Sequence, residues 1–130
     1  MDDLIYYPSG IFMLDELTVD SLLFDFYGEL LPEKQREFFR LYHEENCSLQ
    51  EIAEEYGVTR QGVHDAVRKA ENSLRSYEEK LGLVDRFTRT EEVLRKIDTE
   101  IDSLMNEFSE NRELAAGLLK IKLSLDTLEE

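Results

Sequence analysis

The stretch Ser48–Glu71, SLQEIAEEYGVTRQGVHDAVRKAE, has the pattern of two short helices joined by a tight turn. Ser48 is a good helix N-cap, and Glu51 three residues later completes the form of a capping box. Gly57 follows the first helix at the place where a helix end needs a residue that tolerates a left-handed backbone. Thr59 is then placed to cap a second helix. This order of cap, helix, glycine and cap predicts a helix-turn-helix unit.

Apolar residues at helical spacing define the face that each helix of the unit would bury. In the first helix these residues are Leu49, Ile52, Ala53 and Tyr56. In the second they are Val63, Ala66, Val67 and Ala70. The small side chain of Ala53 would let the two helices approach closely where they cross. The alternative is an ordinary helical hairpin without a role in DNA binding.

The length and composition of the chain limit the classes of protein to which it can belong. A chain of 130 residues that is 42% hydrophobic can form one compact domain with an appended helical arm. It has no apolar run long enough for a transmembrane helix, and its first residues do not resemble a secretory signal, so we expect a cytoplasmic protein without membrane contact. Cys47 is the single cysteine, so an internal disulfide is excluded. With only this cysteine and two histidines, we expect neither a metal site nor a cofactor.

The net charge of −15 argues against simple phosphate binding, because DNA-binding domains are normally basic. The charge is unevenly distributed. Residues 1–47 carry 3 basic and 11 acidic side chains (net −8), residues 48–80 carry 5 and 7 (net −2), and residues 81–130 carry 7 and 12 (net −5). The helix-turn-helix is therefore the least acidic third, and DNA binding by this chain alone should be weak and salt-sensitive.

Residues 1–18 precede the helices that we expect. Two apolar runs, Leu4–Tyr7 and Ile11–Leu14, flank the turn signal Pro8-Ser9-Gly10. The pattern favours a leader that packs on the helical body. A hairpin of strands, or a segment that orders against a partner, are the alternatives.

Two helices are expected ahead of the motif. The first runs from Val19, with an apolar stripe of Leu22, Leu23, Phe26, Leu30 and Leu31, widened by Phe24 and Tyr27. Pro32 suits the start of the second, which should run from Glu33 to about Glu45. Its buried residues should be Phe38, Leu41 and Tyr42, with Phe39 on the margin.

The second helix of the motif should continue to about Leu81, where Gly82 offers a stop. Beyond it, a heptad pattern runs through Phe87, Thr90, Leu94, Ile97, Ile101, Leu104 and Phe108. A break at 109–111 precedes a last helix with Leu114, Leu118, Ile121, Leu125 and Leu128. These two helices either fold back as extra core or form a dimer arm or a partner-binding surface.

The segment from Leu22 to Leu83 resembles the YlxM-type family of small helix-turn-helix proteins of Gram-positive bacteria. The likeness is strongest at Leu23–Tyr27 (LFDFY), Ser48–Glu55 and Val58–Gln61. It implies a fold like region 4 of the primary sigma factors, the part that reads the −35 promoter element. It also implies a DNA-binding regulator, linked by gene neighbourhood with the signal recognition particle pathway.

By similarity to sigma region 4, the second helix of the motif would enter the major groove. The positions offered to DNA would be Thr59, Arg60, Gln61, His64, Arg68 and Lys69. Thr59 and Arg60 would lie near phosphate at the helix N-terminus. Gln61 or His64 could read base edges, and Arg68 could pair with a guanine or a phosphate. Asp65 would repel phosphate, although it could accept from a cytosine amino group; alternatively, the whole set is a solvated helix face.

The sequence does not predict a catalytic site. Its glycines are isolated, so there is no glycine-rich phosphate loop. Adjacent carboxylates such as Glu54 and Glu55 point apart on a helix, and no serine or cysteine has a nearby histidine base with an orienting acid.

We therefore predict an all-α protein with a sigma-region-4-like, wingless helix-turn-helix domain of four helices and a C-terminal helical extension. The boundaries are 1–18 for the N-terminal extension, 19–82 for the helix-turn-helix domain and 83–130 for the helical arm. The predicted function is a DNA-binding transcriptional regulator that acts as a homodimer, with two recognition helices about one DNA turn apart. The alternative is an accessory protein-interaction module of the signal recognition particle pathway, whose acidic surface engages a basic partner. A third hypothesis is an anti-sigma or polymerase-associated factor that mimics region 4.

Overall fold

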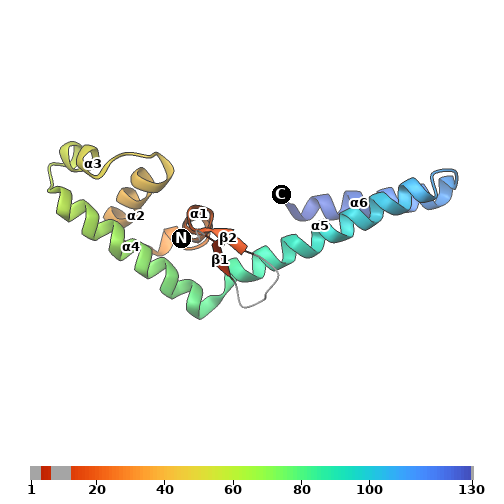
Figure 1. Cartoon of the computed structure of the whole chain (residues 1–130), viewed down its shortest axis with the longest axis horizontal. Helices are drawn as coiled ribbons and strands as arrows, with labels where there is room; N and C mark the ends of the chain where they lie inside the picture. Colours follow the sequence, from red (N-terminus) through yellow and green to blue (C-terminus); the bar gives the residue numbers. More distant parts are fainter. Residues whose placement is uncertain (1–3, 7–12, 130) are drawn as a thin grey trace. The chain divides into compact units, whose positions relative to one another are not determined.

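In the computed structural model the described residues are almost entirely helical, and the predicted all-α class is confirmed (Figure 1). The structure describes residues 4–6 and 13–129, with side chains described over 18–128. The chain divides into two compact units, residues 1–87 and 88–130. None of the described helices combines the length and apolarity that a membrane span requires.

A short antiparallel strand pair precedes the helices. Strand β1 (Leu4–Tyr6) pairs with β2 (Met13–Asp15), and both neighbour helix α1 (Glu16–Tyr27). The pair is the one β feature among the described residues. Of the interpretations given for residues 1–18, the structure therefore agrees with the hairpin of strands. The predicted turn at Pro8-Ser9-Gly10 lies outside the described residues.

Helix α1 is followed by a short 3-10 turn, η1 (Gly28–Leu30). Its buried stripe is Val19, Leu23 and Tyr27, spaced by four residues. Phe26 and Leu30, which were predicted as part of this apolar stripe, are instead exposed. The apolar residues of this helix are so numerous that spacing alone defined too wide a stripe.

Helix α2 (Glu33–Phe39) begins directly after Pro32, as predicted, and passes into a π-helical turn, η2 (Arg40–Glu44). Two burial predictions are wrong here. Phe39 is 0% exposed rather than marginal, and Tyr42 is 38% exposed rather than buried. Because a π turn holds more residues than an α turn, it moves Tyr42 out of the phase that α-helical spacing assumed.

The two helices of the motif are α3 (Leu49–Tyr56) and α4 (Arg60–Leu81). The predicted capping box is present: the Ser48 hydroxyl accepts from the Glu51 backbone N–H at 3.0 Å, and the Glu51 carboxylate accepts from the Ser48 N–H at 3.1 Å. Gly57 has φ 66°, in the left-handed region. Thr59 caps α4 by accepting from the Gly62 N–H at 2.9 Å. The helix-turn-helix prediction is confirmed at each of these local signals.

Helix α4 contributes to two hydrophobic clusters. The cluster inside the motif consists of Phe38, Leu41, Ile52, Ala53, Val63 and Val67. The second consists of Val19, Leu23, Tyr27, Leu31, Phe39, Ala70, Leu74 and Val84. Because one face of α4 is buried in both clusters, its opposite face has a fixed direction toward solvent.

The start of helix α5 (Leu83–Glu107) is capped by a carboxylate from the preceding helix. Glu78 accepts from the backbone N–H of Val84 at 2.9 Å and of Asp85 at 3.0 Å. The Tyr27 hydroxyl donates to Glu78 at 2.7 Å and accepts from the Leu83 N–H at 3.1 Å. Burial, together with the hydrogen bond to the Glu78 carboxylate, raises the pKa of Tyr27 to about 12.

Residues 88–129 form a helical hairpin. The larger part of α5 runs antiparallel to α6 (Arg112–Asp126), which folds back beside it and ends in a 3-10 turn, η3 (Thr127–Glu129) (Figure 1). Asn111 caps α6 by accepting from the Leu114 N–H at 3.1 Å. The predicted break at 109–111 is therefore present.

Candidate nucleic-acid interface

The first half of α4 presents every residue predicted to contact DNA. All six side chains are exposed: Thr59, Arg60, Gln61, His64, Arg68 and Lys69. Thr59 is the N-cap and the others lie on the first three turns of the helix. Val63 and Val67 fix this orientation, because both are buried on the opposite face.

Three cations of this surface make no ion pair with any carboxylate in the described part of the chain. These cations are Arg60, Arg68 and Lys69. By contrast, Arg40 in the π turn η2 is paired with Glu37 and Glu45. Unpaired cations can meet phosphate without first breaking an intramolecular bridge.

The polar side chains between the cations are linked to one another. Gln61 Nε2 donates to Asp65 Oδ1 at 2.9 Å, and His64 Nδ1 lies 3.6 Å from the same oxygen. Gln61 must therefore exchange this bond for one to a base if it reads DNA. Because the Gln61 amide is neutral, its bond to Asp65 does not offset the negative charge of that side chain.

The N-terminus of α4 has a close approach that the sequence interpretation did not identify. A Cβ at Gly62 would lie 3.1 Å from the Thr59 Oγ1, so glycine leaves room for the capping hydroxyl. The Thr59 oxygen accepts the Gly62 N–H, and its own O–H stays available to donate to phosphate. The position of Gly62, three residues after a threonine cap, is the signal that could have indicated this contact.

Helix α3 brings negative charge next to this cationic surface. Glu51, Glu54 and Glu55 are all exposed on it. Hydrogen bonds from the Ser48 backbone N–H and hydroxyl lower the pKa of Glu51, so this carboxylate is ionised at neutral pH. In helix-turn-helix complexes the first helix crosses the DNA backbone, where such carboxylates repel phosphate.

The residues near the motif do not favour nucleophilic catalysis or metal binding. Cys47 is half-buried beside the motif cluster, and burial raises the pKa of its thiol, which disfavours the nucleophilic thiolate. Among the residues whose positions are described, no group of His, Cys, Asp or Glu is arranged to hold a metal ion.

A model of a family described as "Putative helix-turn-helix protein, YlxM / p13 like" matches residues 14–115 of the chain. The chain belongs to this family. The match extends beyond the segment Leu22–Leu83 and takes in α5 and the first turn of α6. The YlxM-like family is described by its helix-turn-helix and by no reaction.

Curated members of the YlxM-like family are close relatives of the chain. A UPF0122 protein of Desulforamulus reducens is 46% identical over 101 residues, which cover 77% of this chain and 86% of the relative. A UPF0122 protein of Halalkalibacterium halodurans is 40% identical over 117 residues, covering 90% of this chain and 100% of the relative. One of Caldanaerobacter subterraneus subsp. tengcongensis is 49% identical over 86 residues, covering 66% and 71%.

Proposed function

We propose that the chain is a DNA-binding transcriptional regulator of the cytoplasm that reads the major groove with the first half of α4 and acts as a homodimer. In this proposal residues 19–82 bind DNA and residues 83–130 mediate association. One observation carries it: three exposed cations that make no ion pair within the described part of the chain lie on the first half of a helix whose buried face is held in two clusters.

The cations would supply the phosphate contacts. Arg60 lies in the first turn of α4, where the helix dipole also favours a phosphate. Arg68 and Lys69 lie two turns further along. Each phosphate contact releases counterions and adds about −0.9 to the slope of log K against log salt concentration.

Base reading would fall to Gln61 and His64 between these cations. A glutamine amide can pair with adenine in the major groove, and a histidine ring can donate to a base acceptor. The bond from Gln61 to Asp65 holds the amide on the helix surface in the free protein. Asp65 would then be left to accept from a cytosine amino group.

Salt-dependent binding of the double variant Arg68→Ala/Lys69→Ala to duplex DNA tests the proposal. Two lost phosphate contacts should flatten the log–log salt slope by about 1.8. The matched control is Lys34→Ala/Lys80→Ala, which removes the same charge from exposed positions on α2 and the last turn of α4. Equal losses in both variants would show that net charge matters and that the α4 surface does not, which would overturn the proposal.

A second candidate function is an accessory protein-interaction module of the signal recognition particle pathway. The observation that favours it is the carboxylate surface of α3, in a chain of net charge −15. The double variant Glu54→Gln/Glu55→Gln separates the two functions by the sign of its effect. It should strengthen binding if α3 faces DNA phosphate, and weaken binding if α3 faces a basic protein.

A further inference from the structure

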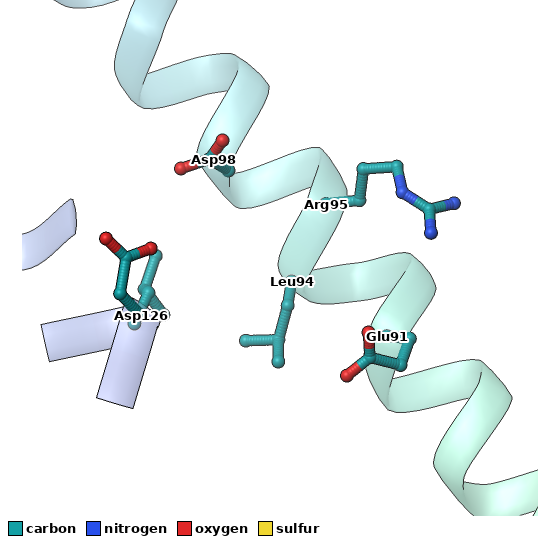
Figure 2. A pocket seen from close by; sticks show the side chains of 6 residues that line it. Glu91, Leu94, Arg95, Asp98 and Asp126 are labelled. Carbon is teal, nitrogen blue, oxygen red and sulfur yellow. The ribbon is translucent and has the colours of Figure 1, made fainter. Parts of the chain in front are cut away.

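The hairpin of α5 and α6 has one side that is closed by polar contacts. Lys122 Nζ lies 3.3 Å from an Asp98 carboxylate oxygen and 2.6 Å from an Asp102 carboxylate oxygen, which ties α6 to α5. Asp98 also lines a small polar pocket of about 170 Å³ together with Glu91, Leu94, Arg95, Leu125 and Asp126. Figure 2 shows Leu94 and Asp98 on the side of α5 that faces Asp126, with the Arg95 side chain directed away.

The other side of the hairpin is apolar and open. We call it the apolar flank, and its large exposed side chains are Val93, Leu104, Phe108, Leu114, Ile121 and Leu128. The three from α6 and η3 recur every seven residues, which is the spacing of one column of a coiled-coil seam. Isolated exposed apolar residues are ordinary on a protein surface, whereas several large ones gathered on one side of a hairpin are typical of an interaction surface.

Helix geometry places Leu104 of α5 and Ile121 of α6 on the same side of the hairpin. Leu104 follows the buried Ile101 by three residues, and Ile121 follows the buried Leu118 by three residues. At 3.6 residues per turn, each exposed residue is therefore rotated from its buried neighbour by about one-sixth of a turn in the same sense along its own helix. Because the two helices run antiparallel, these equal rotations bring Leu104 and Ile121 to one common side of the hairpin.

The interior of this unit is small. Of its described side chains, only those of Thr88, Ile101 and Leu118 are almost completely buried. Two large apolar side chains are far fewer than a segment of this length needs to offset its conformational entropy. Chains this small usually depend on a disulfide, a metal ion or oligomerisation for their stability.

We infer that a second copy of the chain packs its apolar flank against this one, so that the two hairpins form a four-helix bundle. In such a bundle each helix contacts two neighbours, and the apolar flank supplies the contact that the hairpin alone lacks. The inference rests on the homodimer of the proposed function and assigns the surface through which that homodimer forms.

The border of the apolar flank suits an identical partner. Its charged residues are three basic and three acidic, Arg89, Lys96, Glu100, Glu107, Glu113 and Lys120, in a chain whose net charge is −15. Two copies therefore meet here without the repulsion that the rest of their surfaces would produce. Gly117 and Ser124 lie beside the column of Leu114 and Ile121, and a Cβ at Gly117 would meet no atom within 4 Å. Small side chains at these two positions leave space for a neighbouring helix.

Molar mass in solution tests the inference without DNA. The wild-type chain should have twice its chain mass of 15.3 kDa in light scattering and sedimentation experiments. Ile121→Glu should give the chain mass, because a carboxylate cannot be buried at this contact without a partner. The matched control is Leu123→Glu on the opposite side of α6, where the leucine is 57% exposed and Ile121 is 50% exposed; this variant should stay dimeric.

A milder variant keeps the test valid if Ile121→Glu fails to fold. Ile121→Ala should raise the dimer dissociation constant about tenfold, with helix content unchanged at dimer-forming concentrations, and Leu123→Ala should change it less than about twofold. A wild-type chain that is monomeric up to about 0.1 mM would overturn the inference, as would a dimer that tolerates Ile121→Glu. Because no DNA is present, either result leaves the proposed groove reading by α4 to be judged separately.

Discussion

The hydroxyl of Tyr27 should make one of the largest contributions of any single polar group to the free energy of unfolding of the first unit. Its side chain is 1% exposed, and the hydroxyl donates to the Glu78 carboxylate at 2.7 Å while accepting from the Leu83 N–H at 3.1 Å. The change Tyr27→Phe keeps the ring and deletes both bonds. It leaves the part-buried Leu83 N–H without its acceptor and the Glu78 carboxylate with two donors in place of three.

The size of the loss follows from those two bonds. A hydrogen bond to a charged group contributes about 1.5–3 kcal/mol, and an unsatisfied buried donor costs about 1–3 kcal/mol. Since the Leu83 N–H is only part-buried, we expect Tyr27→Phe to lower the free energy of unfolding by about 2–3 kcal/mol at neutral pH. Urea denaturation followed by circular dichroism measures this loss.

A matched control lies in the same aromatic cluster. The Tyr77 ring centroid lies 5.9 Å from that of Tyr27, and the Tyr77 hydroxyl makes no hydrogen bond within the described residues. Tyr77→Phe should therefore change the free energy of unfolding by less than about 0.5 kcal/mol. Equal unfolding free energies for Tyr27→Phe and the wild type would refute the role assigned to the hydroxyl.

Ionisation of the same hydroxyl should lower the stability of the protein in alkali. The pKa of Tyr27 is raised from 10.0 to about 12, so the folded state favours the neutral phenol. The resulting stabilisation is fully present below pH 10 and is lost as the pH rises to about 12, by about 3 kcal/mol for two pKa units. Tyr27→Phe should lack this loss, so the difference in stability between the two proteins should shrink over that pH range.

Two further changes test local features. Ser48→Ala removes the hydroxyl of the capping box and should cost about 1 kcal/mol in urea denaturation, while Ser103→Ala, exposed within α5, should be nearly neutral; equal effects would contradict the capping role. Gly117→Ala should raise the helix stability of α6 by up to about 1 kcal/mol, yet raise the dimer dissociation constant in sedimentation equilibrium, because the added methyl occupies the space of the second copy. An unchanged dissociation constant would place Gly117 outside the dimer contact.

The features of the motif that were predictable depend on neighbours in the sequence. Each of these features links residues no more than four positions apart. They are the capping box of Ser48 and Glu51, the left-handed Gly57 and the Thr59 cap. The bond between Gln61 and Asp65 has the same local origin, since residues four apart are neighbours on a helix. It was predictable and was not predicted.

The features that were not predictable depend on contacts between distant residues. The π turn after Phe39 changes which side chains are buried, and helical spacing carries no signal for it. Glu78 caps α5 together with Tyr27, which lies 51 residues earlier in the chain. Before the fold is known, Glu78 is indistinguishable from the exposed glutamates that surround it.

The exposed surface of α4 was predicted correctly as a set of positions, because the buried Val63 and Val67 determine which side chains face outward. The heptad residues of α5 were predicted as a seam and those of α6 only as a set of apolar residues, and spacing alone did not show which of them face the neighbouring helix. The structure separates them: Ile101 and Leu118 are buried within the hairpin, and Ile121 is open.

The central claim is that this acidic chain binds DNA through α4. The most direct test is a fluorescence-anisotropy titration of the purified protein with random-sequence duplex DNA at about 50 and 200 mM salt. Three phosphate contacts, from Arg60, Arg68 and Lys69, predict that binding weakens about 40-fold per chain over this fourfold change in salt. Absence of binding at the lower salt concentration would contradict the claim and favour a basic protein as the partner.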